Sequence, residues 1–307
     1  MDPFETFRTG TRVRIGAEAQ PWLDRLPGYL DGVRDRWGLE LDEPVGTGAT
    51  GYTVAATRSG EDGAAEDAVL KLSYPDAWFV ESTAALARWN GDGAVRLLAH
   101  DPDGAQLLER AEPGSSLLDK RDEDGALSIA ADVLQRLWVP DPGGIMTVES
   151  ETAEWARTMP GRYHLVGRPF ERSLVTEALD AFRELGPTQP ERVLLHGDLH
   201  MGNVLAAERQ PWLAIDPKPL IGERAFDVTA LLRDKAPDLI DDPAAGRERL
   251  QHRFDLLSER LGLDRPRLRQ WSLAVLVDYA IWDFEVGDTT FGEQQAEVAR
   301  MIRRLIV

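Results

Sequence analysis

Apolar side chains near the start of the chain recur at the spacing of one helical face. They fall at intervals of three or four residues: Trp22, Leu26, Leu30, Val33 and Trp37. Such spacing favours an amphipathic helix. Pro27 interrupts the pattern, and because proline has no backbone N–H to donate, we expect the helix to be broken or bent there.

Strand-like apolar runs dominate from there to about residue 110, apart from a helical stretch at residues 81–89. Residues 112–116 are rich in turn-forming types and are expected to cross between two parts of the chain. Beyond them the spacing is mainly helical, and helices are predicted over residues 127–137 and 173–185, each followed by proline.

The most informative segment is a glycine-containing loop between apolar runs at residues 196–205. Asp198 and Asn203 are five residues apart in it. This is the interval between the catalytic Asp and the metal-binding Asn of the kinase pattern H-R-D-L-x-x-x-N. Asp216, which follows a second buried strand at residues 212–215, supplies another oxygen ligand of the kind that magnesium prefers. The arrangement predicts phosphoryl transfer.

Two other interpretations of this loop stay open on these residues alone. Asp, Gly and Asn are common turn formers, so an ordinary turn beside satisfied core histidines is also compatible. Alternatively, His196, Asp198 and His200 are the ligands of a hydrolytic metal site. The other histidines, at positions 100, 164 and 252, have no metal-ligand spacing, which weakens that alternative.

The other parts expected of a kinase precede this loop in the right order. Gly46, Gly48 and Gly51 form a G-x-G-x-x-G pattern, in which glycines let backbone amides approach phosphate oxygens. Lys71 interrupts the next apolar strand, as expected for a lysine that binds the α- and β-phosphates. Each signal is weak alone, since glycine triplets arise by chance and a lone lysine is commonly an outward-facing strand residue.

Glu81, ten residues beyond Lys71, is a candidate ion-pair partner of that lysine. It stands at the head of the predicted helix 81–89. Acids are also common there because they interact favourably with the helix dipole, so the sequence leaves both explanations open.

Strands early and helices late predict an α+β chain with a two-lobed, protein-kinase-like fold. A small β-rich N-lobe, which would bind the nucleotide, is expected over residues 1–110. A larger, mainly helical C-lobe is expected over residues 111–307, with the nucleotide between the lobes.

These motifs occur together with further stretches spread over most of residues 20–290. The stretches are residues 89–98, 107–110, 211–219, 226–227 and 281–283. On them the chain resembles the aminoglycoside phosphotransferases, in the branch of streptomycin 6-kinases and hydroxyurea phosphotransferases. Their co-occurrence is far more specific than any single motif.

The resemblance implies a role for each matching residue of the catalytic part. Asp198 is implied as the catalytic base. Asn203 and Asp216 are implied as ligands of Mg²⁺, and Lys71 as a ligand of the nucleotide phosphates.

The resemblance also implies a hinge at residues 107–112, where backbone groups near Glu109 and Ala111 would meet the nucleobase. The sequence departs from the family pattern at two positions. Trp138 stands where many relatives carry His, and Glu81 does not have the most familiar offset from the end of its helix.

The length, composition and charge of the chain limit where it is expected to act and what it is expected to bind. A chain of 307 residues can bury a sizeable core in two lobes. It has no cysteine, which rules out disulfides and favours the cytoplasm, and residues 1–5 lack the features of a secretory signal. No apolar run approaches membrane-spanning length.

The net charge of −18 argues against nucleic-acid binding and allows cationic ligands, although it also serves solubility. We expect a monomer or weak dimer.

The chain after Asp216 bears on the acceptor. Protein kinases place a long activation segment with an A-P-E element there, whereas here residues 217–225 leave room only for a short loop. A small molecule is therefore the expected acceptor. Lys218 lies beside the metal-binding Asp in sequence, so it is either near the transferred phosphate or an ordinary surface lysine.

The helical tail is predicted to supply the acceptor site. One stripe at helical spacing contains Trp271, Val275, Asp278, Trp282 and Glu285. Because its apolar members face inward, Asp278 is an acid on a packed face, which is usually paired or functional. Six acids and no Lys or Arg lie between residues 278 and 299. We predict that Asp278, Asp283 and Glu285 hold a cationic acceptor above Trp282; the alternative is a solvated acidic helix.

Together these signals predict a phosphotransferase that moves the γ-phosphoryl group of ATP or GTP to an alcohol group of a small polar acceptor. The favoured acceptor is an aminoglycoside antibiotic such as streptomycin. Hydroxyurea or a secondary metabolite is the alternative, because the catalytic loop does not encode the substrate. A catalytically silent, kinase-like nucleotide-binding protein is a third option. The presence of Lys71, Asp198, Asn203 and Asp216 together argues against it, because a protein that only binds nucleotide does not need all four.

Overall fold

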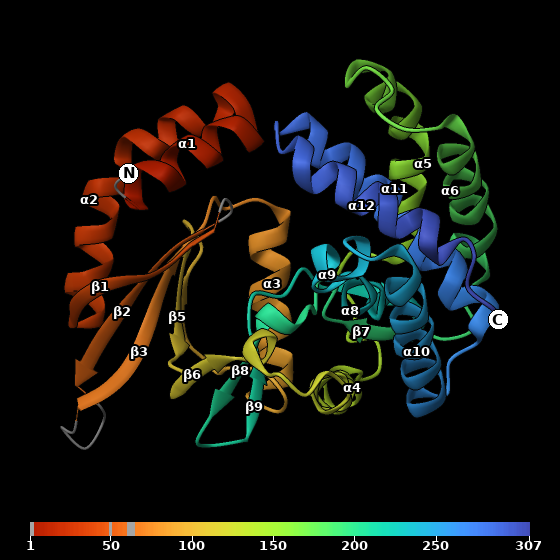
Figure 1. Cartoon of the computed structure of the whole chain (residues 1–307). Coiled ribbons are helices and arrows are strands. Elements are labelled where there is room, and N and C mark those ends of the chain that lie inside the picture. The colour runs from red at the N-terminus through yellow and green to blue at the C-terminus, as the bar shows by residue number, and fades with distance from the viewer. Residues whose placement is uncertain (1–2, 49–50, 60–64) are drawn as a thin grey trace. The chain divides into compact units, whose positions relative to one another are not determined.

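The computed structural model describes residues 3–48, 51–59 and 65–307, with the backbone alone at residues 46–48 (Figure 1). The chain divides into two compact units. The first is Met1–Gly114 with Ala207–Arg209, and the second is Ser115–Ala206 with Gln210–Val307. An antiparallel sheet dominates the first and helices the second, which confirms the predicted α+β class.

A five-stranded antiparallel sheet with the strand order β1-β2-β3-β5-β4 forms the centre of the first unit. Its strands are β1 (Leu39–Gly48), β2 (Gly51–Ser59), β3 (Ala65–Leu72), β4 (Leu97–Asp101) and β5 (Ala105–Glu109). In β3 the side chains alternate, so that Leu70 and Leu72 are buried on one face and Lys71 points to the other.

Helices cover this sheet. They are α1 (Pro3–Ile15), the 3₁₀ turn η1 (Gly16–Ala19), α2 (Gln20–Trp37) and α3 (Ala77–Trp89). Apolar side chains of α1 and α2 share one core with Leu70 and Leu72. Helix α2 runs through Pro27 without a break. Burial of Leu26 and Val33 on either side, worth about 1.5–3 kcal/mol each, offsets the roughly 3 kcal/mol that an internal proline costs.

Helix α3 begins at Ala77, earlier than the predicted residue 81. The Asp76 side chain caps it by accepting a hydrogen bond from the Phe79 N–H at 3.1 Å. Glu81 therefore lies beyond the first helical turn, and the helix-dipole explanation for that acid is wrong.

The second unit is organised around helix α11 (Arg265–Glu285), which is buried along most of its length. The other long helices are α4 (Glu123–Leu137), α5 (Val148–Leu165), α6 (Arg172–Leu185), α10 (Pro243–Leu261) and α12 (Thr289–Ile302). Helices α6 and α12 pack against α11, and Glu171 and Arg300 join these two helices by an ion pair of 2.7 Å. The predicted helices at 127–137 and 173–185 are thus confirmed as α4 and α6.

Short elements, all of them wholly or partly in the second unit, carry the loops that contain Asp198 and Asp216. The strands are β6 (Pro113–Ser116), β7 (Val193–Leu195), β8 (Val204–Ala207), β9 (Trp212–Ala214) and β10 (Leu220–Gly222). The short helices are α7 (Arg224–Asp227), α8 (Thr229–Arg233), α9 (Ala236–Ile240) and the 3₁₀ turns η2 (Leu117–Asp119), η3 (Gly186–Thr188) and η4 (Met201–Asn203). Strand β7 pairs with β10, and β6, β8 and β9 form a three-stranded sheet in that order.

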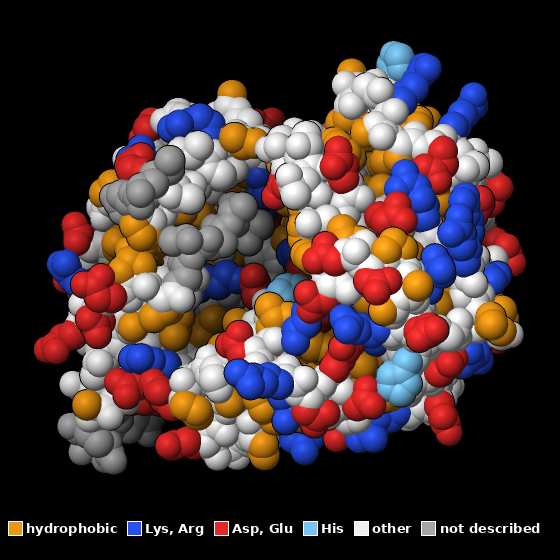
Figure 2. Space-filling model, in the orientation of Figure 1, with side chains coloured by type: hydrophobic (Ala, Val, Ile, Leu, Met, Phe, Trp, Pro, Cys, Tyr) orange, Lys and Arg blue, Asp and Glu red, His pale blue; other side chains and the backbone are white. Residues whose placement is uncertain are grey.

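The described part of the chain contains no helix with the length and apolar character needed to cross a bilayer. Figure 2 shows one face of the molecule, on which Lys and Arg side chains are intermixed with Asp and Glu. On that face the described residues form no continuous basic surface of the kind that follows a nucleic-acid backbone.

Candidate active site

Two short strands bring the predicted metal ligands together. Strands β8 and β9 are antiparallel, and the first residue of β8 pairs with the last residue of β9. The Ile215 N–H donates to the Asn203 carbonyl at 2.9 Å, which extends this pairing by one step. Asn203 comes directly before β8, and Asp216 comes shortly after β9. The strand pairing therefore places their backbones close together.

Asp198 lies in the loop before η4, and cations engage both of its carboxylate oxygens. Lys218 Nζ donates to Oδ2 at 2.7 Å, and Arg233 Nη2 donates to Oδ1 at 3.1 Å. Burial alone raises the pKa of Asp198, but the positive charges of Lys218 and Arg233 outweigh it and hold the pKa below its usual range. Asp198 is therefore ionised at neutral pH, as a group that accepts a proton from a hydroxyl must be.

Gly197 allows the loop to approach the Lys218 backbone closely. Its φ is +79°, and a Cβ there would lie 1.8 Å from the Lys218 carbonyl oxygen. The Lys218 N–H in turn donates to the His196 carbonyl at 2.9 Å. A larger residue at position 197 would force these two segments apart and shift Lys218 from Asp198.

Asp227 holds the backbone of the loop that contains Asp198. Its carboxylate accepts from the His196 N–H at 3.0 Å and the Gly197 N–H at 2.7 Å. The Trp138 indole N–H donates to the same carboxylate at 2.9 Å, and the Arg224 guanidinium lies over the Trp138 ring, 5.6 Å from its centre. The sequence showed Trp138 only as a departure from the family pattern, whereas its indole acts here as a positioning group.

We expect Trp138→Phe to make turnover more sensitive to acid. Burial raises the pKa of Asp227 to about 6, although its three N–H donors lower it, while the charge of Asp198 raises it. Loss of the indole donor raises this pKa further, and a protonated Asp227 can no longer accept from both loop amides. The acid limb of kcat/KM should move to higher pH, with kcat at pH 7 reduced roughly tenfold.

The matched control is Trp155→Phe, which also removes an indole donor to a carboxylate, that of Glu151. It should leave the acid limb in place. An acid limb at the same pH in Trp138→Phe and wild type would contradict the role of the indole.

The loop histidines have structural roles. His196 is fully buried, burial lowers its pKa to about 4, and its Nε2 lies 3.0 Å from the Ile215 carbonyl oxygen. His200 Nδ1 accepts from the Gly202 N–H at 3.1 Å. No group of three or more His, Asp or Glu among the described residues is placed to hold a metal ion. The alternative of a metal site at His196, Asp198 and His200 therefore has no support.

Asn203 and Asp216 form a donor set that suits Mg²⁺. The Asn203 amide nitrogen donates to the Asp198 carbonyl at 3.0 Å, which leaves the side-chain oxygen as the atom for a cation. Asp216 has a φ of +55°, a left-handed conformation that is costly for a residue with a Cβ and is concentrated at functional sites. Mg²⁺ commonly takes one or two protein oxygens and completes its shell with water and phosphate, so two donors are sufficient.

The first unit places Gly51 beside Lys71. In the β1–β2 hairpin Gly46 pairs with Thr53 and Gly48 with Gly51, while the intervening Ala49–Thr50 lies outside the described residues. A Cβ on Gly51 would lie 3.0 Å from Lys71 Cε. Two of the predicted nucleotide ligands are thus neighbours within one sheet.

The same sheet face is covered by the helix that carries Glu81. Lys71 pairs with Gln106 across β3 and β5, so both side chains are on one face. Gln106 Nε2 donates to Ser82 Oγ at 3.0 Å and to Thr83 Oγ1 at 2.8 Å on helix α3. Lys71 therefore faces α3, and an ion pair with Glu81 stays a prediction.

At the predicted hinge, the Glu109 side chain has a structural role. Arg209 donates to it at 2.7 and 2.8 Å, and the Arg96 N–H donates to it at 2.9 Å. Burial raises the pKa of Glu109, but these hydrogen bonds outweigh it and lower the pKa. The Glu109 N–H already donates to the Arg96 carbonyl at 2.9 Å. Contacts of the Glu109 carbonyl and of Ala111 with a nucleobase stay predictions.

The predicted acceptor carboxylates meet an internal cation that the sequence did not indicate. Asp278 is buried on the inward stripe of α11, as expected. Arg162 of helix α5 donates to Asp278 Oδ1 at 2.7 Å and to the Glu285 carboxylate at 2.9–3.1 Å. The stretch from residue 278 to 299 is free of basic residues in sequence, but an arginine from another helix neutralises part of its charge.

The other two predicted acceptor residues differ in exposure. Asp283 is buried and accepts from Gln295 Nε2 at 3.3 Å, and burial raises its pKa to about 6. Trp282 is 41% exposed, so its ring is available to a ligand. A role for these residues in acceptor binding stays a prediction.

Comparison with known proteins agrees with this geometry. Residues 37–287 match the family described as aminoglycoside/hydroxyurea antibiotic resistance kinase. The chain is 37% identical over 291 residues to a streptomycin 6-kinase of Streptomyces glaucescens, covering 94% of this chain and 93% of that one. It is also 37% identical to a hydroxyurea phosphotransferase of Kitasatospora aureofaciens, covering 94% and 82% of the two chains.

Solved structures show the same fold at low identity. An aminoglycoside phosphotransferase, APH(4)-Ia, in a ternary complex with AMP-PNP and hygromycin B has a TM-score of 0.61 at 17% identity, over 88% of this chain and 97% of that one. A choline kinase from Streptococcus pneumoniae has a TM-score of 0.61 at 12% identity, over 90% and 99%. The predicted kinase-like fold is confirmed.

Proposed function

Because the chain belongs to the aminoglycoside/hydroxyurea antibiotic resistance kinase family, we propose that it transfers the γ-phosphoryl group of ATP to a hydroxyl of streptomycin or a similar aminoglycoside. It is a phosphotransferase that uses an alcohol group of a small molecule as acceptor. The cytoplasm is the compartment in which we propose that it acts, as a monomer or weak dimer.

The observation that carries the proposal is the buried Asp198, which pairs with Lys218 and Arg233 and accepts a hydrogen bond from Asn203, the residue that the β8–β9 pairing brings near Asp216. Asp198 orients the acceptor hydroxyl by accepting its hydrogen bond and takes the proton as the oxygen–phosphorus bond forms. The bond between the γ-phosphorus and the bridging oxygen breaks, and the electron pair leaves with ADP. Asp227 and Gly197 keep the loop in position during this step.

Asn203 and Asp216 are the proposed ligands of Mg²⁺. A bound magnesium ion would neutralise the charge that develops on the phosphate oxygens. Within the first unit, Lys71 and the backbone of Gly46, Gly48 and Gly51 are proposed to bind the phosphates.

For the remaining nucleotide contacts, we propose that Glu81 orients Lys71 and that the backbone near Glu109 and Ala111 meets the adenine. The support is the sheet register, which puts Lys71 on the face that α3 covers.

One observation favours a second acceptor class. Arg162 already occupies the Asp278 and Glu285 carboxylates, so the region offers less free negative charge than its sequence suggests. A small neutral acceptor such as hydroxyurea would not need those acids. Measuring ADP release from Mg-ATP with streptomycin, other aminoglycosides and hydroxyurea tests the proposal. Turnover with hydroxyurea and none with aminoglycosides would support the second class instead.

If the acceptor is cationic, replacing Asp283 and Glu285 together by Asn and Gln should raise the KM for streptomycin. A charge pair that stays accessible to water contributes about 0.2–1 kcal/mol, so the loss of two such pairs should raise the KM roughly two- to thirtyfold. Added salt should raise the wild-type KM in the same direction, because screening weakens such pairs. The Kd of the nucleotide should not change.

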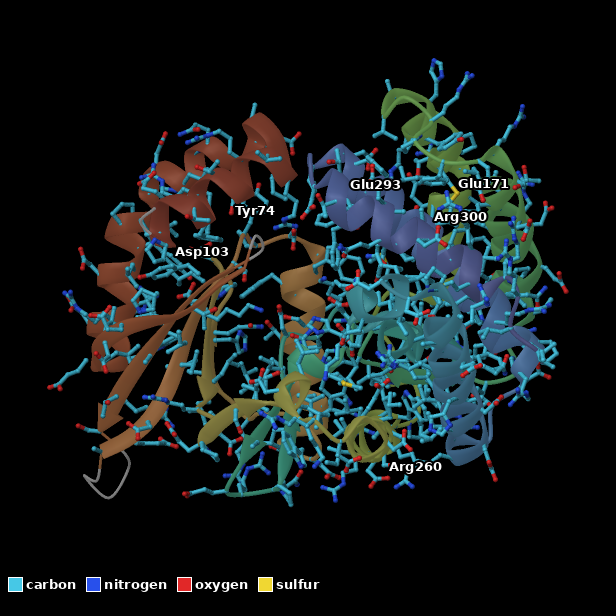
Figure 3. The ribbon with its side chains drawn as sticks, viewed as in Figure 1. Tyr74, Asp103, Glu171, Arg260, Glu293 and Arg300 are labelled. Atoms are coloured by element: carbon cyan, nitrogen blue, oxygen red, sulfur yellow. The ribbon has the colours of Figure 1, made fainter. Side chains whose placement is uncertain are left out.

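The matched control is Glu293→Gln, which removes one charge from an exposed position on helix α12 (Figure 3). It should have no effect on the streptomycin KM. An equal KM in the control and the double variant would place the acceptor site elsewhere.

A further inference from the structure

The two cations on Asp198 differ in how firmly they are held. The Lys218 side chain is 43% exposed, whereas the Arg233 side chain is 14% exposed. Lysine carries a compact charge on a flexible stem, and arginine a planar group that stacks on aromatic rings. The Arg233 guanidinium lies over the Tyr279 ring, 5.1 Å from its centre. Arg233 is therefore held by a second contact, whereas Lys218 is the more exposed of the two cations and pairs with Asp198 Oδ2 through a flexible side chain.

A second observation concerns the hydrogen bonds of Arg233. Its Nε is buried and has no hydrogen-bond partner among the described residues. A buried donor without a partner is destabilising. Hydrogen bonding of the Arg233 Nε therefore does not explain why the side chain lies where it does. Its contacts with Asp198 and Tyr279 account for its orientation.

The acceptor hydroxyl needs access to an oxygen of Asp198, which is only 7% exposed. The Oδ1 side is occupied by Arg233, whose side chain is the less exposed of the two, so Lys218 on Oδ2 marks the more open side. An approaching hydroxyl would therefore meet Lys218 first.

We propose that Arg233 is the permanent counter-ion that positions Asp198, and that Lys218 is a displaceable one that leaves Oδ2 to the acceptor hydroxyl. The hydroxyl proton then passes to Oδ2 as the oxygen bonds to phosphorus and ADP departs with its electron pair. The released Lys218 ammonium becomes available to the phosphoryl oxygens. This inference rests on the proposed role of Asp198 as the base.

The test compares Arg233→Met with Lys218→Met, using kcat and the acceptor KM for streptomycin. In Arg233→Met, Lys218 becomes the sole counter-ion and is held on Oδ2. The expected result is a kcat reduced roughly ten- to a hundredfold, as for a misplaced catalytic group, and a KM raised severalfold. In Lys218→Met, kcat should fall, but the KM should stay the same or decrease because nothing competes for Oδ2.

Two further variants keep the comparison interpretable. Arg233→Lys retains the charge without the planar group and should recover part of the kcat lost in Arg233→Met. Arg260→Met removes an exposed arginine that pairs with Asp132 on the surface, and it should match wild type (Figure 3). Thermal melting of each variant checks that it is folded; if Arg233→Met does not fold, Arg233→Lys is compared with Lys218→Met instead.

The proposal would be overturned if the KM changed in the same direction in Arg233→Met and Lys218→Met, or if Arg233→Met kept the wild-type kcat. Either result would show that the two cations do not have different roles at Asp198. Failure of the proposed acceptor is distinguishable, since wild type would then not phosphorylate streptomycin. In that case the KM comparison is made with hydroxyurea, and ATP hydrolysis without acceptor reports whether Arg233→Met and Lys218→Met still lower phosphoryl transfer to water.

Discussion

Replacement of Asp198 by asparagine should reduce kcat by roughly 100- to 10,000-fold, the range expected when a general base is removed. Asparagine keeps the shape of the side chain but cannot take the hydroxyl proton. The Kd of ATP, measured by calorimetry, should stay close to that of wild type, since the lost interaction acts mainly in the transition state.

The Asp198→Asn variant also leaves Lys218 and Arg233 without their shared carboxylate. Asp198 and Arg233 are largely shielded from water, and removal of one partner from such a pair costs about 3–5 kcal/mol, so a lower melting temperature is expected and must be measured beside turnover. Asp132→Asn, at an exposed position on α4, is the matched control. Near-normal turnover in a folded Asp198→Asn protein would exclude the assignment of Asp198 as the base.

The second large effect is expected at Asp216. Asp216→Asn should lower kcat roughly a hundredfold or more, because a magnesium ion bound there would contribute several kcal/mol to transition-state stabilisation and the amide is a weaker ligand. Titration of Mg²⁺ at fixed ATP should show activity rising only at higher magnesium concentrations than in wild type.

A substitution at Asn203, the other proposed metal ligand, provides the comparison for Asp216→Asn. Asn203→Asp keeps an oxygen ligand and should not shift the magnesium requirement upward, although loss of the N–H that donates to the Asp198 carbonyl should lower its kcat. If Asp216→Asn kept the wild-type magnesium dependence, the metal would be bound by other residues.

The reaction implied by Asp198 therefore depends on two kinds of residue. Asn203 and Asp216 belong to the two motifs that the sequence pattern singles out, whereas Asp227, Trp138 and Arg233 come from other segments and hold the loop around Asp198. Variants of the second kind should affect pH dependence and the balance of kcat and KM more than the ability to bind nucleotide.

The sequence by itself determined the class of fold and the chemistry. The five-residue interval from Asp198 to Asn203 is a local property, and so is Asp216 at the end of an apolar strand. Because strand pairing follows from such short apolar runs, the sequence pattern was sufficient to expect Asn203 and Asp216 side by side. The spacing of apolar residues likewise predicted helices α4 and α6.

Local spacing was less informative at helix boundaries. Asp76 caps α3 and moves its start to Ala77, which removed the dipole explanation for Glu81. Pro27 did not break α2, since burial on both sides of the proline decides that outcome and is a tertiary property.

Only the tertiary structure decided which charges meet. Lys218 and Arg233 reach Asp198 from 20 and 35 residues away, and Arg162 reaches Asp278 from 116 residues away. Hydrophobic periodicity shows which face of a segment is buried, but it does not show which distant side chain that face will meet. Ion pairs act over a few ångströms, so the counter-ions of the proposed catalytic and acceptor carboxylates depend on how helices pack, which the sequence pattern does not specify.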